Sequence, residues 1–413
     1  MPLFTPLLLP NGAVIPNRIA KAAMEENMAD SDHAPSAALL RLYQAWADGE
    51  AGLILTGNVM VDARAMTGPG GVVLEDDAHL DRFKAWAQVG RSRGAQVWMQ
   101  INHPGRQMPA ALGQQTVAPS PVALDLGAQS SRFAMPKAMS ADDIEDVKNR
   151  FVASALLAER AGFTGVQIHA AHGYLLSQFL SPLSNQRDDA WGGSLHNRAR
   201  LLLDIVQAVR AAVTPGFAVA VKLNSADFQR GGFSPDDARA VVQMLAPLGV
   251  DLVELSGGSY EAPAMMGTSR DERTLAREAY FLEFARDIVA VAAMPLMVTG
   301  GIRRPEVAQQ VLDSGVAMVG IATALALEPA LPRQWREGQA TAPMLLQPIT
   351  WKNKALAAAA HMGAVKYQLS RLSQQRPPHP GVSPVWALLT SQVSALWHAR
   401  TYRQWMLKRS AGG

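Results

Sequence analysis

Two histidines and a tyrosine at a short interval are the residues of this sequence best suited to chemistry on a carbonyl compound. They lie in the segment His169-Ala-Ala-His172-Gly-Tyr174. Two imidazole N–H groups that converge on one point can polarise a carbonyl oxygen while negative charge develops on it. A phenol two residues further along can deliver a proton to carbon when it is well placed. The segment therefore predicts a carbonyl clamp, His169 and His172, beside a proton donor, Tyr174.

The same two histidines allow other interpretations. A His-x-x-His pair can bind a metal, and histidines can also have a purely structural role at the end of a strand. No neighbouring carboxylate completes a set of metal ligands. We therefore expect no metal, and the structural role stays open as the alternative.

Gln100 and Lys222 are polar side chains inside apolar segments. Gln100 stands among Val97, Met99 and Ile101, and a buried amide there needs a hydrogen-bond partner. Lys222 lies near the end of a similar apolar segment. It either serves a site or pairs with a carboxylate inside the fold.

The elements that must position these residues are short apolar segments alternating with helical patterns. Continuously apolar strands that alternate with helices predict parallel pairing with both faces covered, and eight such units in roughly 330 residues predict a closed (β/α)₈ TIM barrel. An open doubly wound sheet is the alternative, but no Gly-x-Gly-x-x-Gly follows the first strand. The expected strands are Ile19–Met24, Leu53–Val61, Gln96–Asn102, Gly165–Ala171, Ala218–Asn224, Leu252–Ser256, Pro295–Gly300 and Met318–Ala322. The expected helices include Ser36–Gly49, Ala78–Arg93, Ala141–Ala161, Ser194–Val213, Ser234–Leu248 and Arg304–Ser314.

Two further segments complete the expected barrel. Leu7 to Ile15 contains Asn11-Gly12, a dipeptide typical of tight hairpins, and we expect this hairpin to cap the bottom of the barrel. The long segment His103–Ser140 follows the third strand, and a loop of that length predicts a lid or a substrate loop. The His169 motif ends the fourth strand, at the carboxyl face where such barrels carry out catalysis.

The longer segment around this motif resembles the signature of the old yellow enzyme family, which comprises FMN-containing ene-reductases. The segment runs from Val166-Gln-Ile-His169 through Ser181-Pro182 and Asn185-Gln-Arg187 to Trp191-Gly-Gly-Ser194. The similarity extends from Leu3-Phe-Thr-Pro6 to about Pro329, so it covers the barrel but not the tail. Other matching segments are Asn17-Arg18-Ile19, Gly52-Leu-Ile-Leu55, Gln100-Ile-Asn-His103-Pro-Gly-Arg106 and Gly300-Gly301.

The resemblance implies roles for residues at matching positions. His169 and His172 would hold the electron-withdrawing oxygen of the substrate, and Tyr174 would protonate its Cα. Gln100 would bond the flavin pyrimidine ring, and Lys222 would stabilise the reduced flavin with its charge. NADH or NADPH would be the co-substrate. The other expected cofactor contacts are Ala23, Met24, Glu25, Asn58, Gly300, Gly301, Arg303, Gly320, Ala322 and Thr323.

Three positions depart from the family pattern. Glu25 stands where the family usually has Cys or Thr; because a carboxylate there would disfavour reduced flavin, we expect Glu25 to be neutral or turned away. Ala322-Thr323 replaces the Gly-Arg that meets the phosphate, so Arg303 or Arg304 is expected to supply the cation. The chain has no cysteine, which excludes disulfides and the iron–sulfur module of longer relatives and fits a cytoplasmic protein.

The segment after the barrel has a different composition. No Asp or Glu follows Glu337, and nine Lys and Arg give this tail +9, leaving −6 on the rest of the chain. We expect two domains, residues 1–332 and 333–413, with Val385–Arg409 as a helix. Its apolar residues at helical spacing are Trp386, Leu389, Val393, Leu396 and Trp397.

We favour docking of this helix on its own barrel or on a second subunit, and thus a homo-oligomer. A basic helix lying on a membrane surface is the alternative, and we expect no nucleic-acid partner. No uncharged apolar stretch reaches the roughly 18 residues that span a bilayer.

Three functions fit these features. The first is an FMN-dependent ene-reductase that acts on α,β-unsaturated carbonyl or related small molecules. The second is a related flavin dehydrogenase, NAD(P)H oxidase or demethylase, and the third is a flavin-free barrel lyase or binding module. Tyr174 as a proton donor favours the first.

Overall fold

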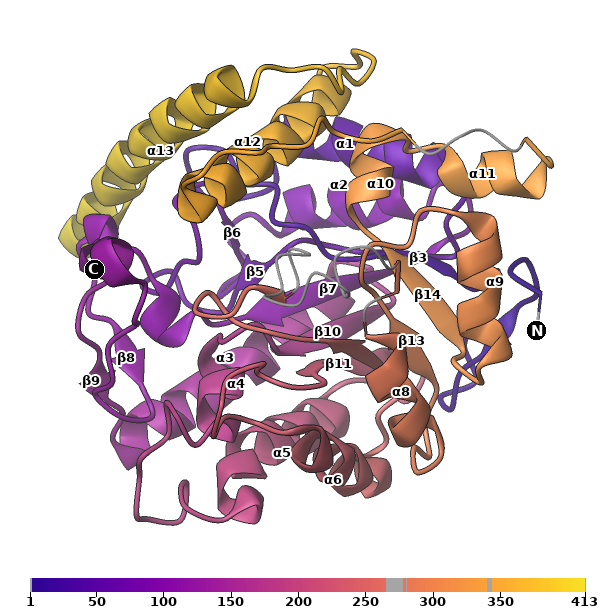
Figure 1. Ribbon diagram of the computed structural model, residues 1–413. Coiled ribbons are helices and arrows are strands. Elements are labelled where there is room, and N and C mark those ends of the chain that lie inside the picture. Colours follow the sequence, from indigo (N-terminus) through magenta and orange to yellow (C-terminus); the bar gives the residue numbers. More distant parts are fainter. Residues whose placement is uncertain (1, 265–277, 280, 340–343, 413) are drawn as a thin grey trace.

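A closed ring of eight parallel strands forms the centre of the computed structural model, which describes residues 2–264, 278–279, 281–339 and 344–412 (Figure 1). Strand β10 pairs with β11 on one side and with β7 on the other, and these pairings close the ring. The (β/α)₈ barrel expected from the sequence is therefore confirmed. In chain order its strands are β3 (Ile19–Lys21), β4 (Leu53–Leu55), β7 (Gln96–Asn102), β10 (Gly165–Ala170), β11 (Ala218–Asn224), β12 (Leu252–Ser256), β13 (Leu296–Val298) and β14 (Met318–Ile321).

One expected strand divides into two. Leu53–Val61 forms β4 in the ring and then β5 (Val59–Met60), which leaves the ring. Strand β5 pairs with the carboxyl end of β7 and with β6 (Val72–Val73). Both β4 and β5 pair with β7, and the segment that connects them contains Asn58.

Helices cover the outside of the ring, and the caps expected from the sequence are present. Ser140 and Ser234 each form a capping box with the acid three residues on, which satisfies two exposed backbone N–H groups at each helix start. The helices are α1 (Ala37–Asp48), α2 (Leu80–Gly90), α3 (Ala141–Arg160), α4 (Leu175–Leu180), α5 (Leu195–Ala212), α6 (Pro235–Leu245), α8 (Leu282–Val289), α9 (Pro305–Asp313) and α10 (Thr323–Leu327).

The expected amino-terminal hairpin closes the floor of the barrel. Strands β1 (Leu7–Leu8) and β2 (Val14–Ile15) pair antiparallel. Leu7 and Ile15 pack in one buried cluster with Leu53 and Trp98 of the barrel strands. Because this floor is filled with apolar side chains, the open end of the barrel is the carboxyl end of its strands.

The long segment after β7 is built from short elements. They are η1 (Gly105–Gln107), η2 (Ala110–Leu112), β8 (Val117–Ala118), η3 (Gly127–Arg132) and β9 (Lys137–Ala138). Strands β8 and β9 pair in parallel. The segment lies beside the barrel mouth, where its role as a substrate wall stays a prediction.

The tail forms three helices, α11 (Leu331–Arg336), α12 (Lys354–Ser373) and α13 (Pro384–Gly412). Helix α12 packs against α1, and α13 packs against α12 at the outer edge of the molecule (Figure 1). The expected helix is present, and it docks on its own chain. The apolar residues that were expected to carry the contact do not form the docked face. Ala387, Ala399 and Tyr402 are buried instead, while Trp386 and Trp397 are exposed.

The division at residue 332 stays a prediction, since α11 runs across it. Among the described residues, no helix is both long and apolar enough to cross a bilayer.

Candidate active site

His169 lies near the end of β10, and a strained turn after this strand carries His172 and leads to Tyr174. His172 and Gly173 have φ angles of 61° and 74°, which belong to the left-handed region that β-carbon-bearing residues avoid. The turn is held because the N–H of His172 donates to Asn224 Oδ1 (3.0 Å) and Gln107 Nε2 donates to the carbonyl of His172 (3.0 Å). The turn therefore delivers Tyr174 to the start of α4, back toward the ring of His169.

The structure brings the three aromatic rings of the motif close together. The centroid of the His169 ring lies 5.0 Å from that of His172 and 4.9 Å from that of Tyr174. The N–H of Ala171 donates to His169 Nδ1 (3.2 Å), so the proton of a neutral His169 sits on Nε2. His172 differs, because its Nε2 lies 2.7 Å from Ser256 Oγ. To donate a hydrogen bond from this nitrogen to a substrate oxygen, His172 must give up its contact with Ser256.

Burial keeps both histidines neutral. It lowers the pKa of each imidazole well below the usual value, and the nearby charge of Lys222 lowers it further. A neutral imidazole donates one hydrogen bond without adding charge. The pair can therefore polarise an oxygen at neutral pH without competing with Tyr174 as an acid.

The hydroxyl of a second tyrosine, Tyr260, lies beside the hydroxyl of Tyr174. The two hydroxyl oxygens of Tyr174 and Tyr260 are 3.2 Å apart, and Asn58 Nδ2 makes a longer contact of 3.5 Å to the Tyr174 oxygen. Burial raises the pKa of Tyr174 well above its usual value, and the neighbouring Tyr260 and the charge of Glu25 act in the same direction. The phenol of Tyr174 thus stays protonated, with a hydroxyl beside it that can stabilise the phenolate after proton transfer.

Four polar side chains form a buried chain of contacts inside the ring. Gln100 Nε2 donates to Gln167 Oε1 (2.6 Å), and Gln167 Nε2 donates to Glu254 Oε2 (2.8 Å). Lys222 Nζ lies 2.9 Å from Glu254 Oε1. The ion pair considered for Lys222 is therefore present, and it fixes Gln100 and Lys222 in one network across strands β7, β10, β11 and β12.

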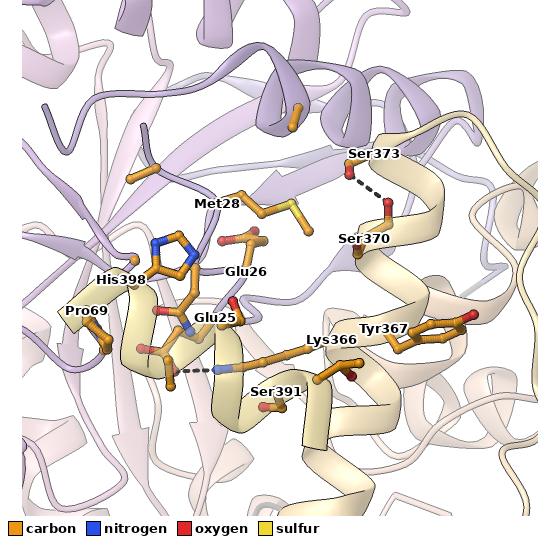
Figure 2. A pocket seen from close by; sticks show the side chains of 18 of the residues that line it. Glu25, Glu26, Met28, Pro69, Lys366, Tyr367, Ser370, Ser373, Ser391 and His398 are labelled. Carbon is orange, nitrogen blue, oxygen red and sulfur yellow. Dashed lines mark hydrogen bonds and ion pairs between the residues drawn. The ribbon is translucent and has the colours of Figure 1, made fainter. Parts of the chain in front are cut away.

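The negative charge of Glu25, just after β3, is offset by a lysine of the tail. Its carboxylate accepts a hydrogen bond from Thr67 Oγ1 (2.6 Å) and lies 4.0 Å from Lys366 Nζ of α12. Figure 2 shows this pair in a cavity of about 640 Å³ between the loops after β3 and β5 and the helices α12 and α13. His398 of α13 lines the same cavity. The tail thus reaches the carboxyl end of the barrel.

The residues expected near a phosphate gather at the neighbouring ends of β13 and β14. Gly300 and Gly301 have φ angles of 122° and 76°, conformations that favour glycine. Gly320 has a packing reason as well, because a Cβ there would lie 2.4 Å from Thr299 Cγ2. Ala322 precedes α10, and Thr323 is its first residue.

The two arginines proposed for the phosphate share one carboxylate. Nε of Arg303 and Nε of Arg304 lie 3.0 Å and 2.8 Å from Glu278 Oε1. Two guanidinium groups against one carboxylate leave one positive charge at this side of the mouth.

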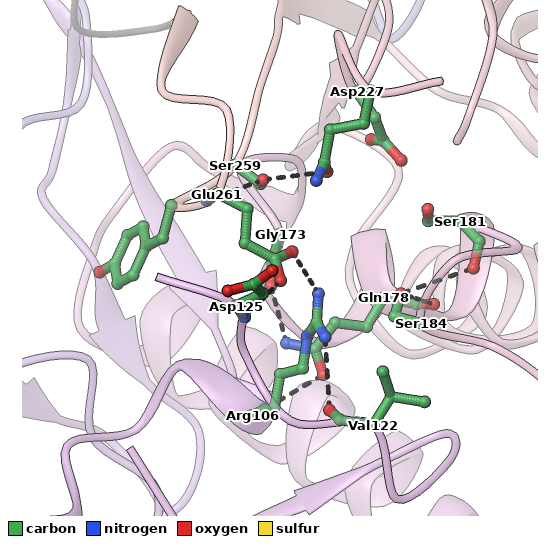
Figure 3. Close-up of polar contacts among 12 residues, drawn as sticks. Arg106, Val122, Asp125, Gly173, Gln178, Ser181, Ser184, Asp227, Ser259 and Glu261 are labelled. Atoms are coloured by element: carbon green, nitrogen blue, oxygen red, sulfur yellow. Dashed lines mark hydrogen bonds and ion pairs between the residues drawn. The ribbon is translucent and has the colours of Figure 1, made fainter. Parts of the chain in front are cut away.

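Loops from three strands are tied together beneath Tyr260 by Arg106. Its Nη2 donates to Glu261 Oε2 (2.6 Å), and its Nη1 donates to the carbonyls of Val122 and Ala123. Figure 3 shows Gln178 reaching back to Gly173 in the same cluster. This network connects the loops after β7, β10 and β12, which sets Tyr260 against Tyr174.

The groups at the mouth suit an FMN molecule. Asn58 Oδ1 is buried without a hydrogen-bond partner, so a polar group is needed opposite it. The positive φ angles of Gly300 and Gly301 turn a side-chain-free backbone outward at the strand ends, as close approach to a phosphate requires. An amide, a cation and this backbone are thus available around one opening.

The chain is similar to known flavin oxidoreductases over most of its length. Residues 2–342 match the family described as NADH:flavin oxidoreductase / NADH oxidase. The chain is 36% identical over 350 residues to the NADH-dependent flavin oxidoreductase iliE of Hypocrea jecorina, covering 79% of this chain and 87% of that protein. It is 38% identical over 353 residues to iliE of Neonectria sp., with 79% of this chain but only 46% of that protein covered.

Solved structures agree with this similarity. The old yellow enzyme homologue from Zymomonas mobilis is 26% identical, with a TM-score of 0.71 and coverage of 84% of this chain and 95% of that chain. Fold and site thus define a flavin-dependent barrel oxidoreductase. The chain belongs to the NADH:flavin oxidoreductase / NADH oxidase family of old yellow enzyme type, whose members use FMN with a reduced nicotinamide nucleotide as co-substrate.

Three residues of the site escaped the sequence-based prediction, namely Gln167, Glu254 and the positioning residue Arg106. Gln167 and Glu254 interrupt otherwise apolar strands, and that pattern, applied to every strand, would have revealed them. Arg64, which follows β5, pairs with Asp62 and Asp146, and its side chain is 56% exposed.

Proposed function

We propose that the protein reduces activated C=C bonds of α,β-unsaturated carbonyl or related compounds. The observation that carries this proposal is a neutral phenol, Tyr174, held against the ring of His169 at the open end of the barrel. A dehydrogenase or oxidase of the same build needs a flavin site but no such acid. The acid therefore favours alkene reduction.

The substrate oxygen is held by the histidines. His169 donates from Nε2, since its Nδ1 accepts the N–H of Ala171. His172 joins when its Nε2 leaves Ser256. These donors stabilise the negative charge that grows on the oxygen during attack at Cβ.

Tyr174 then gives its hydroxyl proton to Cα of the substrate. The hydroxyl of Tyr260, 3.2 Å away, turns its hydrogen toward the phenolate oxygen and stabilises it. FMN, when bound, supplies the hydride that it has taken from NADH or NADPH.

The cofactor contacts are proposed at the positions that correspond to the flavin contacts of the family, including the departures at Glu25, Ala322 and Thr323. Gln100 and Lys222 hold the pyrimidine side, with Ala23, Met24, Glu25 and Asn58 along the edge. The backbones of Gly300, Gly301, Gly320 and Ala322, the hydroxyl of Thr323 and the charge of Arg303 hold the phosphate side.

The proposal is tested with cyclohexenone. The purified protein, loaded with FMN, is expected to oxidise NADH or NADPH anaerobically in step with formation of cyclohexanone. His169→Ala is expected to lower the rate by about 100-fold, the lower range for a lost oxyanion donor. An FMN-loaded protein that consumes nicotinamide nucleotide only with oxygen, and leaves the enone intact, is an oxidase and contradicts the proposal.

A further inference from the structure

Helix α13 leaves one apolar face uncovered. Seven large apolar side chains along it are between 55% and 72% exposed. A contiguous apolar patch on a protein surface marks an interaction site. These residues, called the outer stripe below, are Val385, Trp386, Leu389, Val393, Leu396, Trp397 and Leu407.

The outer stripe has the spacing of a helix–helix seam. Positions 386, 389, 393, 396, 400, 403 and 407 alternate steps of three and four residues, which is the heptad pattern of knobs-into-holes packing. Six of the seven apolar residues come first, Arg400 and Arg403 occupy the next two positions of the same helix face, and Leu407 ends it. The face therefore has an apolar half and a half that contains both arginines.

The opposite face of α13 is already used by its own chain. Ala387 packs in a cluster with Ala364 and Val382, and Ala399 and Tyr402 pack against the loops of the barrel. The Tyr402 hydroxyl donates to the carbonyl of Ala63 (2.8 Å). Because these contacts fix the helix, the outer stripe faces solvent, along the edge of the molecule where Figure 1 places α13.

A second copy of the same stripe is complementary to it in the antiparallel direction. When Val393 faces Leu396 of the other copy, Trp386 faces Arg403 and Leu389 faces Arg400. This follows because the two residue numbers of each antiparallel pair add up to the same value. The arginine stems then cover apolar surface, and a guanidinium lies on an indole face, a favourable cation–π contact. The two Arg400 side chains lie about 16 Å apart along the axis at 1.5 Å per residue, beyond the screening length of about 8 Å.

Two other arrangements fit the stripe less well. A parallel pair sets Arg400 against Arg400 and Arg403 against Arg403, which like charges disfavour. A helix lying on anionic lipid carries Lys and Arg along its polar face, yet residues 385–397 contain no Lys or Arg. The cations of the stripe lie in line with its apolar residues instead.

We propose that the outer stripe of α13 is the interface of a two-fold homodimer in which two α13 helices pack antiparallel. The pairing does not depend on the proposed reaction. Helix α13 also lines the cavity beside Glu25 with Ser391 and His398 (Figure 2).

The first test is sedimentation equilibrium of the full, FMN-loaded chain. Leu396→Asp is expected to weaken dimerisation at least 10-fold, while Leu8→Asp leaves it unchanged. Leu8 is the matched control, since it is 68% exposed against 72% for Leu396 and lies on the amino-terminal hairpin. A wild-type chain that stays monomeric, or a dimer that Leu396→Asp leaves intact, overturns the proposal.

The second test uses the absence of cysteine from the chain. Leu396→Cys lies next to the two-fold axis and is expected to form an intermolecular disulfide on oxidation. Trp386→Cys is expected not to, because its equivalent in the other copy lies 17 residues away along the axis, about 25 Å at 1.5 Å per residue. Cross-linking of both variants overturns the antiparallel arrangement. A monomer that co-sediments with phosphatidylserine vesicles, and loses this with Leu396→Asp, assigns the stripe to lipid instead.

Discussion

Among single residues, Glu25 and Lys366 show how the tail enters the chemistry of the barrel. Glu25 follows Met24 directly, and its charge is met by Thr67 and by a lysine some 340 residues later in the chain. Its field extends to Tyr174 and Tyr260, whose pKa values it raises. At its proposed position beside the flavin, the carboxylate of Glu25 disfavours the anionic reduced form, and the charge of Lys366 offsets this effect.

Removing the charge of Glu25 and removing the charge of Lys366 should move the midpoint potential of the bound flavin in opposite directions. Glu25→Gln is expected to raise the potential and Lys366→Met to lower it. Each shift should be on the order of 10 mV, because a partly exposed charge interacts with a neighbouring charged group by less than about 1 kcal/mol and about 30 mV corresponds to 1.4 kcal/mol for a two-electron couple. Spectroelectrochemical titration of the purified variants measures it.

A double variant separates the charge effect from a change of structure. Because the fields of two charges add, Lys366→Met is expected to lower the potential by about the same amount in the Glu25→Gln background, so the double variant should lie near the wild-type potential. A Lys366→Met shift that disappears without Glu25 would show that the lysine acts only by positioning the carboxylate.

At the level of elements, the turn after β10 sets the positions of His172 and Tyr174 relative to His169 of the strand. A Cβ at Gly173 would lie 2.6 Å from Gln107 Oε1 and 2.8 Å from Ser259 Cβ, on a backbone with φ of 74°. Gly173→Ala is therefore expected to cost about 1–3 kcal/mol of stability and to lower alkene reduction at least 10-fold. Urea unfolding and steady-state kinetics check the two effects.

Gly12 is the matched control for this substitution. It has φ of 85°, and a Cβ at this position would meet no heavy atom within 4 Å, so Gly12→Ala carries the backbone strain without the clash. It is expected to lower stability by about 1 kcal/mol and to leave the rate unchanged. A loss of rate in Gly12→Ala equal to that in Gly173→Ala would rule out the positional explanation.

Much of the barrel could be predicted because its signals are local. The ranges of β7, β11 and β12 coincide with the expected strands, and the caps at Ser140 and Ser234 begin the expected helices. Strand β13 is shorter than expected, because Thr299 and Gly300 lie beyond the last paired residue, Val298. Strand ends depend on neighbours in space, which a sequence pattern does not contain.

The site could be predicted only where one motif carries it. His169, His172 and Tyr174 belong to one segment, and the structure brings them together. The meeting of Tyr260 with Tyr174 depends on loops tied by Arg106, more than 150 residues away from Glu261. The docked face of α13 was predicted wrongly for the same reason. Both faces of this helix are apolar, and only contacts with the rest of the chain decide which one is buried.

For the whole molecule, burial of neutral histidines makes stability depend on pH. Burial lowers the pKa of His103 to about 4, and those of His169 and His172 well below the usual value. In the unfolded chain these groups take up protons near pH 6.5, whereas the folded protein resists. Their contribution to stability is therefore complete above pH 6.5 and is lost as the pH falls toward the folded values.

The free energy of unfolding is expected to fall by about 1 kcal/mol per buried histidine between pH 7.5 and 5.5. Urea titrations at the two pH values measure the difference. His103→Gln should make that difference about 1 kcal/mol smaller, because the variant has one buried histidine fewer. A difference that the substitution leaves unchanged would show that His103 does not resist protonation in the folded state.

The central claim, that Tyr174 is the proton donor of an alkene reductase, is tested most directly by separating the two half-reactions of Tyr174→Phe. In anaerobic stopped-flow experiments, reduction of the FMN-loaded variant by NADH or NADPH should proceed at the wild-type rate, since no proton from Tyr174 is needed there. Reoxidation of the reduced variant by cyclohexenone should slow by about 100-fold or more, the range for a lost general acid. Equal reoxidation rates in variant and wild type would contradict the account.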